Sequence, residues 1–474
     1  MNRQSAVDAV RHMLQGPRWY EAQRLEVLAA AMRPWTARTA LAALEIRGVT
    51  TEQMEGSLAA LAGLARKSHT NFLPLILDVF GQALKVDNYL TGGEVDPQTG
   101  RRINRTTSSP WTWWQRNQFG AKQTGINRGA LHYGVSYATV LPSLVSQQTA
   151  VHMRPVSPRQ MTALYGEPLE WDPREGGPVD DAWPIEAMEM KGPMIRLYDE
   201  RAVHFIGVKQ VPQSALGWRD PSYLSVNNFE YIEGRNHDVG VCPVVRFQDR
   251  ILLDGEEQYG IIEPLLTIQE RLNETTYEML VAQYWSAFRQ RYVMGWIPKS
   301  QQEALRHAAS DTWYFKDANV KAGQFEATEL KNYIESKDSG LRDLAAIGQV
   351  PAQQLGLSGI SNISEASLAA LEAGKDRKVS EIETSLGESY EQLLRTAAHI
   401  AGDEAAAADF ASEVVWADAT ARSFAQTVDG LGKLATMLDV PEEILWEDIP
   451  GWTREKVLRA REARAAAGDP LIEV

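Results

Sequence analysis

The spacing of apolar residues predicts three long helices in the second half of the chain. The first lies in EPLLTIQERLNETTYEMLVAQYWSAF, with Pro264 in its first turn, and the second, which stops at Gly348 and Pro351, is of similar length. A short mixed α/β insert, RQRYVMGWIPKSQQEALRHAASDTWYFKDANVKAGQFEAT, separates them. Two helices joined by a compact insert must run antiparallel and pack along their apolar stripes. The third helix follows at about 364–400 and would be roughly 54 Å long at the rise of an α-helix. The apolar positions are Leu265, Ile268, Leu272 and Met279 in the first helix; Leu330, Tyr333, Ile334, Leu341, Leu344 and Ile347 in the second; and Val379, Ile382, Leu386, Tyr390 and Leu393 in the third.

The rest of the chain predicts a change from helix to strand and back, which makes the fold class α+β. Ala and Leu recur at helical spacing up to about residue 90. Between about 150 and 250 the pattern is mostly that of strands, and MIRLYDERAVHFIGV predicts two strands with a turn at Asp199 and Glu200. VSYATVL and GVCPVVRFQ each predict another strand. The tail from residue 403 is Ala-rich and acidic and reads as helical.

The segment between the second and third helices, VPAQQLGLSGISNISEASLAALEAG, carries no charge until Glu365. Asn362, three residues before Glu365, resembles the start of a capping box for the third helix. Gly356 and Gly359 satisfy a G-x-x-G pattern, but the segment has no Lys or Arg that could hold a phosphate. A hinge or mobile loop is therefore the favoured interpretation.

Composition limits the classes of function. Of 474 residues, 44% are hydrophobic and 23% charged, as in an ordinary globular protein. The net charge of −14 argues against a tight grip on duplex DNA. The single cysteine, Cys242, excludes an intramolecular disulfide and a multi-cysteine metal site and suits a reducing cytoplasm. We expect no secretion and no membrane span, because the start lacks a signal-peptide core and NFLPLILDVF is too short.

No linear motif predicts catalysis, a cofactor or a metal. P-loop, zincin, nucleophile-elbow and dinucleotide fingerprints are all missing from the sequence. Acidic pairs such as Glu256 and Glu257, together with 14 tryptophans, leave open an enzyme acting on sugars or acidic polymers. With 62 acidic residues, such pairs are more simply solvated acids on helix faces. The aromatic cluster PWTWW, from Pro110 to Trp114, could stack bases, but anchoring in a core or subunit interface is favoured.

The order of elements resembles the portal proteins of tailed double-stranded-DNA bacteriophages, of the long-tailed type. Four stretches carry the resemblance, which spans about residues 70–470: RGALHYGVSYATVLP; HDVGVCPVVRFQDR leading into GIIEPLLTIQERLNETTYEML; GLSGISNISEASLAALEAG; and VVWADATARSFAQTVDGLGKLATMLDVPEEILWEDIPGWTREKV. The resemblance implies an elongated subunit with these parts: an N-terminal wing at 1–255, stem helices at 256–286 and 328–349, a clip at 287–327, a tunnel loop at 350–364, a long wing helix at 365–402 and a helical crown at 403–474.

The resemblance also implies a structural, non-enzymatic role. Portal subunits form a ring, generally of a dozen copies, at one capsid vertex, through which the terminase motor packages DNA and through which the DNA later leaves. The implied partners are the terminase large subunit, the major capsid protein, scaffolding protein and a head-completion or adaptor protein. The implied location is the virion, with assembly in the host cytoplasm. A non-viral oligomeric scaffold is the remaining alternative, motivated by the long helices.

The implied site residues fall into two groups. Five lie in the tunnel loop and would face the DNA: Gln353, Gln354, Ser358, Ser361 and Asn362. Three basic residues are candidates for the channel wall or a subunit interface: Arg271, Arg289 and Arg291.

Overall fold

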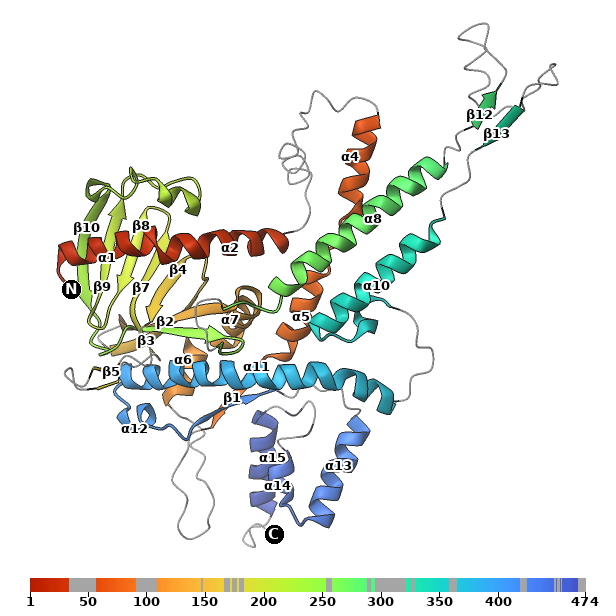
Figure 1. The fold of residues 1–474 in the computed structure, drawn as a ribbon. Coiled ribbons are helices and arrows are strands. Elements are labelled where there is room, and N and C mark those ends of the chain that lie inside the picture. The colour runs from red at the N-terminus through yellow and green to blue at the C-terminus, as the bar shows by residue number, and fades with distance from the viewer. Residues whose placement is uncertain are drawn as a thin grey trace. The chain divides into compact units, whose positions relative to one another are not determined.

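The computed structural model describes most of the chain and divides it into two compact units, shown in Figure 1. The first unit is Met1–Ala417 and the second is Asp418–Val474. Helices and antiparallel sheets are both present, as expected for an α+β chain. The described residues are 1–33, 57–90, 109–145, 148–165, 171–172, 177–178, 183–252, 258–287, 291–294, 321–324, 329–357, 365–417, 424–446, 449, 452 and 454–467.

Two antiparallel sheets form the strand-rich part of the first unit, which confirms the prediction for residues 150–250. One sheet has five strands in the order β10-β9-β8-β7-β4, and the other has three in the order β11-β2-β3. The strands are β2 Val135–Val145, β3 Gln148–Val156, β4 Met161–Tyr165, β7 Pro184–Lys191, β8 Met194–Tyr198, β9 Ala202–Val208, β10 Phe229–Asn236 and β11 Val244–Gln248.

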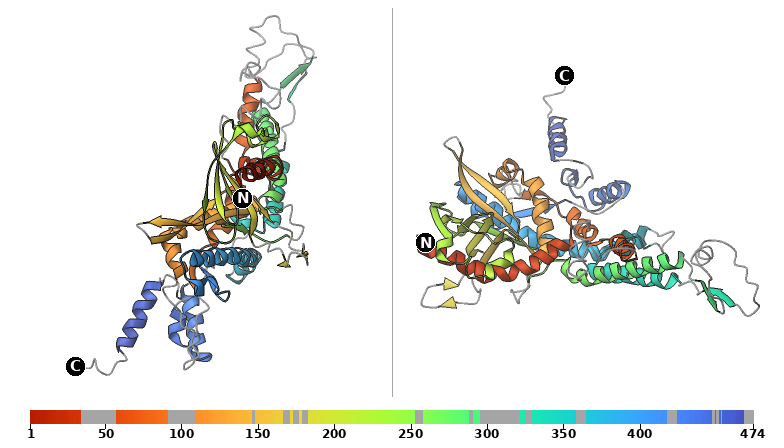
Figure 2. Two further views of the ribbon diagram at one scale, coloured as in Figure 1. Left: turned by 90° about the vertical axis from the view of Figure 1, so that its left-hand side faces the viewer. Right: turned by 90° about the horizontal axis from the view of Figure 1, so that it is seen from above.

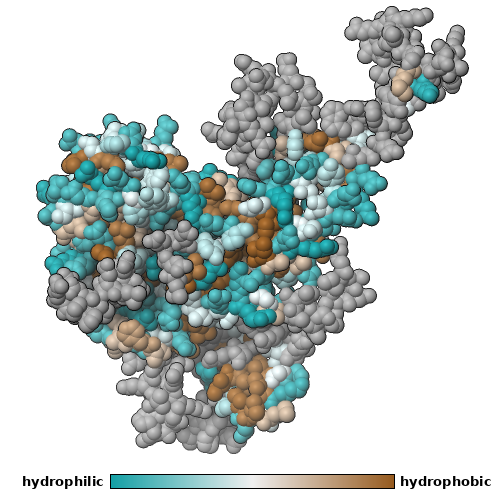
Figure 3. Space-filling model, in the orientation of Figure 1, coloured by the Kyte–Doolittle hydropathy of each residue, from teal (hydrophilic) through white to brown (hydrophobic). Residues whose placement is uncertain are grey.

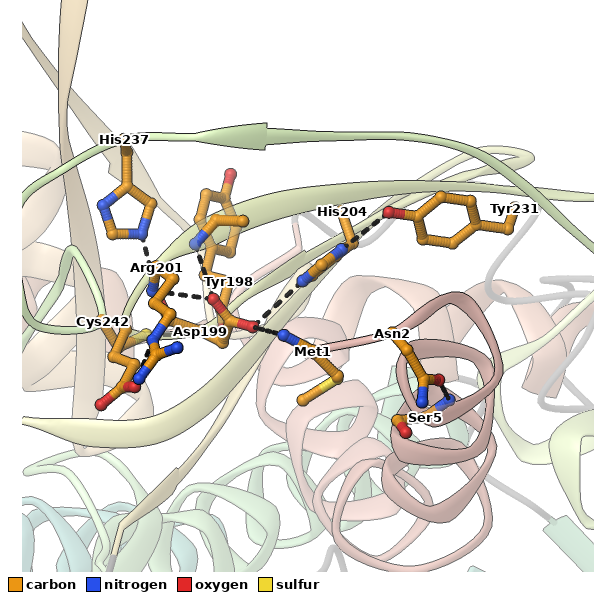
Figure 4. A network of polar contacts seen from close by, with 12 residues as sticks. Met1, Asn2, Ser5, Tyr198, Asp199, Arg201, His204, Tyr231, His237 and Cys242 are labelled. Atoms are coloured by element: carbon orange, nitrogen blue, oxygen red, sulfur yellow. Dashed lines mark hydrogen bonds and ion pairs between the residues drawn. The ribbon is translucent and has the colours of Figure 1, made fainter.

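Asp199 holds the predicted turn between β8 and β9, as Figure 4 shows. Its Oδ1 accepts hydrogen bonds from the backbone N–H groups of Arg201 at 2.9 Å and Ala202 at 2.6 Å. Its Oδ2 lies 3.0 Å from Nε2 of His204, whose Nδ1 lies 3.0 Å from Oη of Tyr231 on β10. One carboxylate therefore fixes both the turn and the pairing of three neighbouring strands.

Helices cover one face of the five-stranded sheet, and the three-stranded sheet covers the other. Helix α1, Arg3–Gln15, buries its apolar side against Met188, Leu197 and Trp218. It is followed by α2, Pro17–Ala31, and Figure 1 shows α1 (red) lying across the strands and α2 continuing past β4. Cys242 is buried between the two sheets, so the one cysteine of the chain is a core residue.

The long helix α11, Glu365–Ile400, runs through the largest core of the molecule and confirms the third predicted helix. Tyr390 is fully buried at its centre, with its ring 5.5 Å from that of Trp114 and 4.8 Å from that of Phe247. Its hydroxyl donates to Oδ1 of Asn127 at 2.6 Å. Trp114, the last residue of PWTWW, is therefore a core anchor, as the sequence favoured. The helices around α11 are α5 Leu73–Ala83, α6 Ser109–Arg116 and α7 Phe119–Tyr133.

Two short strands lie where the sequence predicts helix, and that prediction was wrong. Strand β1, Val86–Leu90, pairs antiparallel with β14, Glu413–Trp416. Oη of Tyr89 and Oγ of Ser412 lie 2.6 Å apart although the residues are 323 positions apart in sequence. Neither strand is long enough to show alternation, so only the distant partner decides their conformation. The pairing also places residues 413–417 in the first unit.

The second unit is helical, as predicted for the end of the chain. It contains α13 Phe424–Met437, α14 Glu442–Leu445 and α15 Arg454–Ala467. The remaining short elements of the first unit are β5 Trp171–Asp172, β6 Gly177–Pro178, α12 Glu404–Ala407 and the 3-10 turns η2 Ala215–Arg219 and η3 Val226–Asn228.

Candidate functional site

Two helices that pack against each other form the candidate site together with the segment that follows them. Helix α8, Leu266–Ala287, is preceded by a 3-10 turn, η4, at Glu263–Leu265. Helix α10 spans Lys331–Gly348. Figures 1 and 2 both show the two helices side by side (green and turquoise).

The contacts between α8 and α10 run in opposite directions along the two helices. Leu265 lies beside Gly348, and Leu272 lies beside Gly340. Because the partner number falls as the α8 number rises, the helices are antiparallel, as predicted. Leu265 of η4, Ile268 and Leu272 of α8, and Leu341, Leu344 and Ala345 of α10 are buried in the same core.

Gly340 permits the close approach of the two helices. A Cβ atom at this position would lie 2.7 Å from Cδ2 of Leu272, which is itself buried. Glycine in a helix interior costs about 1 kcal/mol relative to alanine. The sequence alone marks Gly340 as a weak point of the helix, whereas the structure shows that a larger residue would force the side chain of Leu272 to shift.

The backbone before α8 is seated on the end of α7. A Cβ on Gly134, which has φ +84°, would lie 2.7 Å from the backbone carbon of Tyr259. A Cβ atom on Gly260 would clash with the backbone oxygen of Leu131. The N–H of Ile261 donates a hydrogen bond to that oxygen at 2.8 Å. Residues 258–262 are thus held in a non-helical path, and Pro264 lies in the 3-10 turn η4 that leads directly into α8.

Polar contacts reinforce this seat. The guanidinium of Arg24 on α2 pairs with Glu263, with Nε 2.8 Å from Oε2, and donates to the backbone oxygen of Tyr133 at 2.9 Å. On the other flank, Nε2 of Gln269 donates to the backbone oxygen of Thr70 at 2.8 Å, and its Oε1 accepts from the N–H of Phe72 at 2.8 Å. Helix α4, Ser57–Ser68, lies against α8 on that flank.

A buried carboxyl lies beside the same seat. Nε2 of Gln258 donates to Oδ1 of Asp249 at 3.2 Å. Burial raises the pKa of Asp249 to about 7, although Arg250 and Lys378 act in the opposite direction. Lys378 comes from α11, and its own pKa is lowered by burial and then by Arg250. No linear signal points to this cluster, because its members come from the end of β11, the start of the helix pair and α11.

The segment after α10 begins inside the core and then turns outward. The 3-10 turn η5 spans Ala352–Leu355, and Val350 and Leu355 are buried with the helix pair. Gln354 is exposed, whereas both polar side-chain atoms of Gln353 are enclosed without a hydrogen-bond partner. Ser358, Ser361 and Asn362 lie outside the described residues, and so does the predicted capping box.

The structure describes the three candidate basic residues to different extents. Arg271 of α8 pairs with Asp343 of α10, with Nη2 2.5 Å from Oδ2, and both side chains are about half exposed. Arg289 lies outside the described residues. Arg291 begins β12, Arg291–Met294, which pairs antiparallel with β13, Lys321–Gln324, and its side chain is outside the description. These strands are the described part of the predicted insert at 287–327.

The exposed side of α8 is acidic. Glu270, Glu274 and Glu278 recur at four-residue intervals, which places them on one side of the helix, and all three are exposed. Leu265 and Leu272 lie on the opposite side and are buried. Within the described ranges, no group of three metal-ligating side chains could hold an ion, and no helix is long and apolar enough to cross a membrane.

Comparison with known proteins identifies the family. Residues 60–469 match the family described as "Phage portal protein, SPP1 Gp6-like". The chain is 24% identical to the portal protein of Mycobacterium phage D29, covering 90% of this chain and 84% of that protein. It is also 24% identical to the portal protein of Mycobacterium phage L5, covering 68% of this chain and 65% of that protein.

Solved structures of gene transfer agent particles are also similar. A chain in the neck of an empty particle with C6 symmetry matches at 11% identity and a TM-score of 0.43, covering 88% of this chain and 94% of that one. A chain of the native virion matches at 12% identity and a TM-score of 0.46, covering 80% and 93%. The family match confirms the resemblance seen in the sequence. The chain belongs to the SPP1 Gp6-like family of phage portal proteins, and its role is the structural one of a portal.

Proposed function

We propose that this chain is one subunit of a ring of about a dozen copies at a capsid vertex, through which double-stranded DNA enters and later leaves. The observation that supports this best is the antiparallel pair α8 and α10, followed at once by η5 and α11. In this proposal residues 256–286 and 328–349 are the stem, 287–327 the clip, 350–364 the tunnel loop and 365–402 the long wing helix. The wing takes 1–255 and the crown 403–474.

The charge of α8 suits a wall along which DNA slides. Glu270, Glu274 and Glu278 present carboxylates on its exposed side. Carboxylates repel phosphates, so a duplex beside them would not be held. Gln353, Gln354, Ser358, Ser361 and Asn362 would then touch the DNA through uncharged groups. Arg271, Arg289 and Arg291 remain predictions for the channel wall or a subunit interface.

Electron microscopy of the purified chain tests the ring. We expect rings with a central hole a little wider than duplex DNA. Compact single subunits at all concentrations would contradict the proposal and would return the scaffold and enzyme alternatives to consideration.

Shortening the tunnel loop tests its role. Because Leu355 belongs to the core, the deletion should be confined to 358–362. We expect rings to form and DNA packaging or retention to fail. A same-length replacement of 358–362 by Gly and Ser is the control, since it keeps the reach of the loop and changes its side chains. Normal packaging by the deletion variant would remove the assigned role.

The clip is proposed to dock the terminase large subunit during packaging and the head-completion or adaptor protein afterwards. A charge reversal within 287–327 at a residue other than Arg289 and Arg291, such as Lys321→Glu on β13, should weaken terminase binding in a direct affinity measurement. Arg342→Glu on the exposed side of α10 is the matched control and should leave that affinity unchanged. Equal affinities for all variants would contradict the clip assignment. Contacts with the major capsid protein and scaffolding protein are proposed for the wing and crown.

A further inference from the structure

The end of β11 is bonded to both α11 and the base of the helix pair. Toward α11, Oγ of Ser385 donates to the backbone oxygen of Gln248 at 2.9 Å. Toward the helix pair, Nε2 of Gln258 donates to the backbone oxygen of Arg250 at 2.8 Å and to Oδ1 of Asp249 at 3.2 Å. The carboxyl of Asp249 therefore lies between the two elements, and a change in its charge acts on both.

This carboxyl is buried without an ion pair. Asp249 is 1% exposed. Arg250 and Lys378 lie near enough to act on its charge, yet neither forms an ion pair with it in the part of the chain that the structure describes. An unpaired carboxylate in such a place is costly, so the neutral acid is the favoured form. The pKa of Asp249, which burial raises to about 7, agrees with this.

Two cationic groups beside Asp249 also lack a carboxylate partner among the described residues. Nζ of Lys378 lies 5.0 Å from the centre of the Phe80 ring, with which it makes a cation–π contact. Nε of Arg250 is enclosed and has no hydrogen-bond acceptor, although Nη2 of the same guanidinium donates to the backbone oxygen of Tyr259 at 3.1 Å. A buried acid without a cation next to two cations without an acid implies a second arrangement in which they meet.

We propose that Asp249 and Lys378 form a charge-controlled latch between α11 and the base of the helix pair. While the acid is neutral, the ammonium group of Lys378 stays on the Phe80 ring. When the acid releases its proton to solvent, the ammonium group leaves the ring and pairs with the carboxylate. The long, flexible side chain of a lysine permits this move without unwinding of α11. All of these contacts lie within one copy of the chain, so the latch does not depend on the ring.

The sign of the pH dependence follows from the number of protons bound. The paired arrangement holds one proton fewer, so a rise in pH through about 7 favours it. Arg250 acts in the same direction, because its charge also lowers the pKa of Asp249. On the lysine, burial and Arg250 lower the pKa of Lys378, whereas Asp249 and the exposed Glu381 of α11 raise it.

The latch links the position of α11 to a proton. By reciprocity, a displacement that brings Lys378 toward the carboxyl promotes release of the proton. Helix α11 begins at Glu365, just after the proposed tunnel loop. A displacement of that loop would therefore reach the latch along the helix, and this last step rests on the proposed function.

NMR of the full-length chain with carbon-13 dimethylated lysines tests the latch. Dimethylation keeps the charge, and a methyl group above an aromatic ring has an upfield-shifted proton signal. We expect the Lys378 signal, assigned by its loss in Lys378→Arg, to lie upfield at about pH 6 and to reach an ordinary position at about pH 8, with a midpoint near 7. The signal of Lys375, whose Nζ lies 3.6 Å from Oδ1 of Asp376, should not move.

Two variants identify the group that controls the lysine. Asp249→Asn should keep the Lys378 signal upfield throughout, because no carboxylate forms. Glu381→Gln removes the exposed carboxyl near the same lysine and is the matched control, in which the signal should still move with pH.

A Lys378 signal that stays in one position from about pH 6 to 8 would overturn the latch. So would a movement that persists in Asp249→Asn, since another group would then control the lysine. Either result leaves the ring untouched, because electron microscopy decides the ring separately. Conversely, a chain that forms no ring but shows the expected movement would overturn the proposed function and keep the latch.

Discussion

The two units of the chain bury their apolar side chains to very different extents. The first unit has one cluster of 37 buried residues that joins α5, α7, the helix pair, α11 and β14. The second unit, among its described residues, leaves half of its large apolar side chains exposed and buries only Leu445 and Val457. Figure 3 shows apolar residues gathered on the second unit (brown, lowest part of the view). Small units bury too little surface to be stable without help. The first unit is therefore stabilised by an extensive core of its own, whereas the described part of the second unit buries much less apolar surface.

The largest expected contrast comes from removing one large side chain in each unit. Tyr390→Ala should lower the unfolding free energy of the first unit by about 3–5 kcal/mol, because it empties the centre of the core and leaves Asn127 without its donor. Leu434→Ala, the matched change on α13, should cost less than about 0.5 kcal/mol in single subunits. Urea unfolding followed by tryptophan fluorescence measures both. Similar losses in the two variants would show that the second unit has a core of its own.

A pH series sharpens the comparison, because the buried carboxyl Asp249 belongs to the first unit. The folded protein keeps the proton up to about pH 7, whereas the unfolded chain releases it near pH 4. The folded state therefore binds more protons between these values, and the unfolding free energy falls as the pH rises from about 4 to 7.

Asp249→Asn removes this dependence. It should stabilise the first unit at pH 8 by roughly 2 kcal/mol, less than the whole effect of burial because Arg250 and Lys378 lose a counter-charge. The gain should shrink toward pH 4, and α13 should not respond. Melting temperatures measured from pH 5 to 8 give the result. If the melting temperatures of the variant and of the unchanged protein changed with pH in parallel, the result would contradict a buried, protonated Asp249.

The same glycine-to-alanine change should have opposite signs in the two units. Gly340→Ala should destabilise the helix pair by about 1 kcal/mol. The new methyl group must displace the side chain of Leu272, and the free-energy cost of this shift exceeds the gain in helix propensity. Gly430→Ala should stabilise α13 by about 0.5–1 kcal/mol, because the space is open. Hydrogen exchange of each helix in single subunits measures both effects. A gain at Gly340 would mean that the two helices are not closely packed.

The smallest effect is expected at the exposed ion pair of the helix pair. Arg271→Ala should cost at most about 1 kcal/mol, since both partners are about half exposed and solvent screens the charges. The loss should shrink further in high salt. Denaturant unfolding at two salt concentrations checks this. A large, salt-independent loss would place Arg271 in a second contact.

Long periodic elements could be predicted from the sequence, and contacts between distant segments could not. The stripe ending at Leu393 predicts α11 to within a residue, because a pattern over many turns averages out local exceptions. The turn at Asp199 was also predictable, since strands of ordinary length flank it. Strands β1 and β14 were not, because four or five residues carry no period and each strand needs the other.

The parts of the candidate site also differ in whether they could be predicted from the sequence. Helix pair, insert and following segment could be predicted from stripes and from Gly348 and Pro351. The seat of the pair could not, because the meeting of Gly134 with Gly260 is set by tertiary contact alone. No sequence pattern distinguishes Gly340, where an added Cβ atom would contact Leu272, from Gly430, where it would contact nothing within 4 Å.

The seat of α8 on α7 has a mechanical consequence. Its deeply buried residues lie in the first half of the helix, near Leu265, Ile268 and Leu272, while the side chains that the structure describes beyond Tyr277 are partly exposed or exposed. The helix pair is therefore held firmly at one end, where it enters the core, and projects from the core at the other end. A sideways force on the far end would produce its greatest bending moment at residues 260–272, where the backbone touches α7 and the side chains enter the core. The force would be transmitted to α11 through the packed residues 260–272 rather than along the covalent chain.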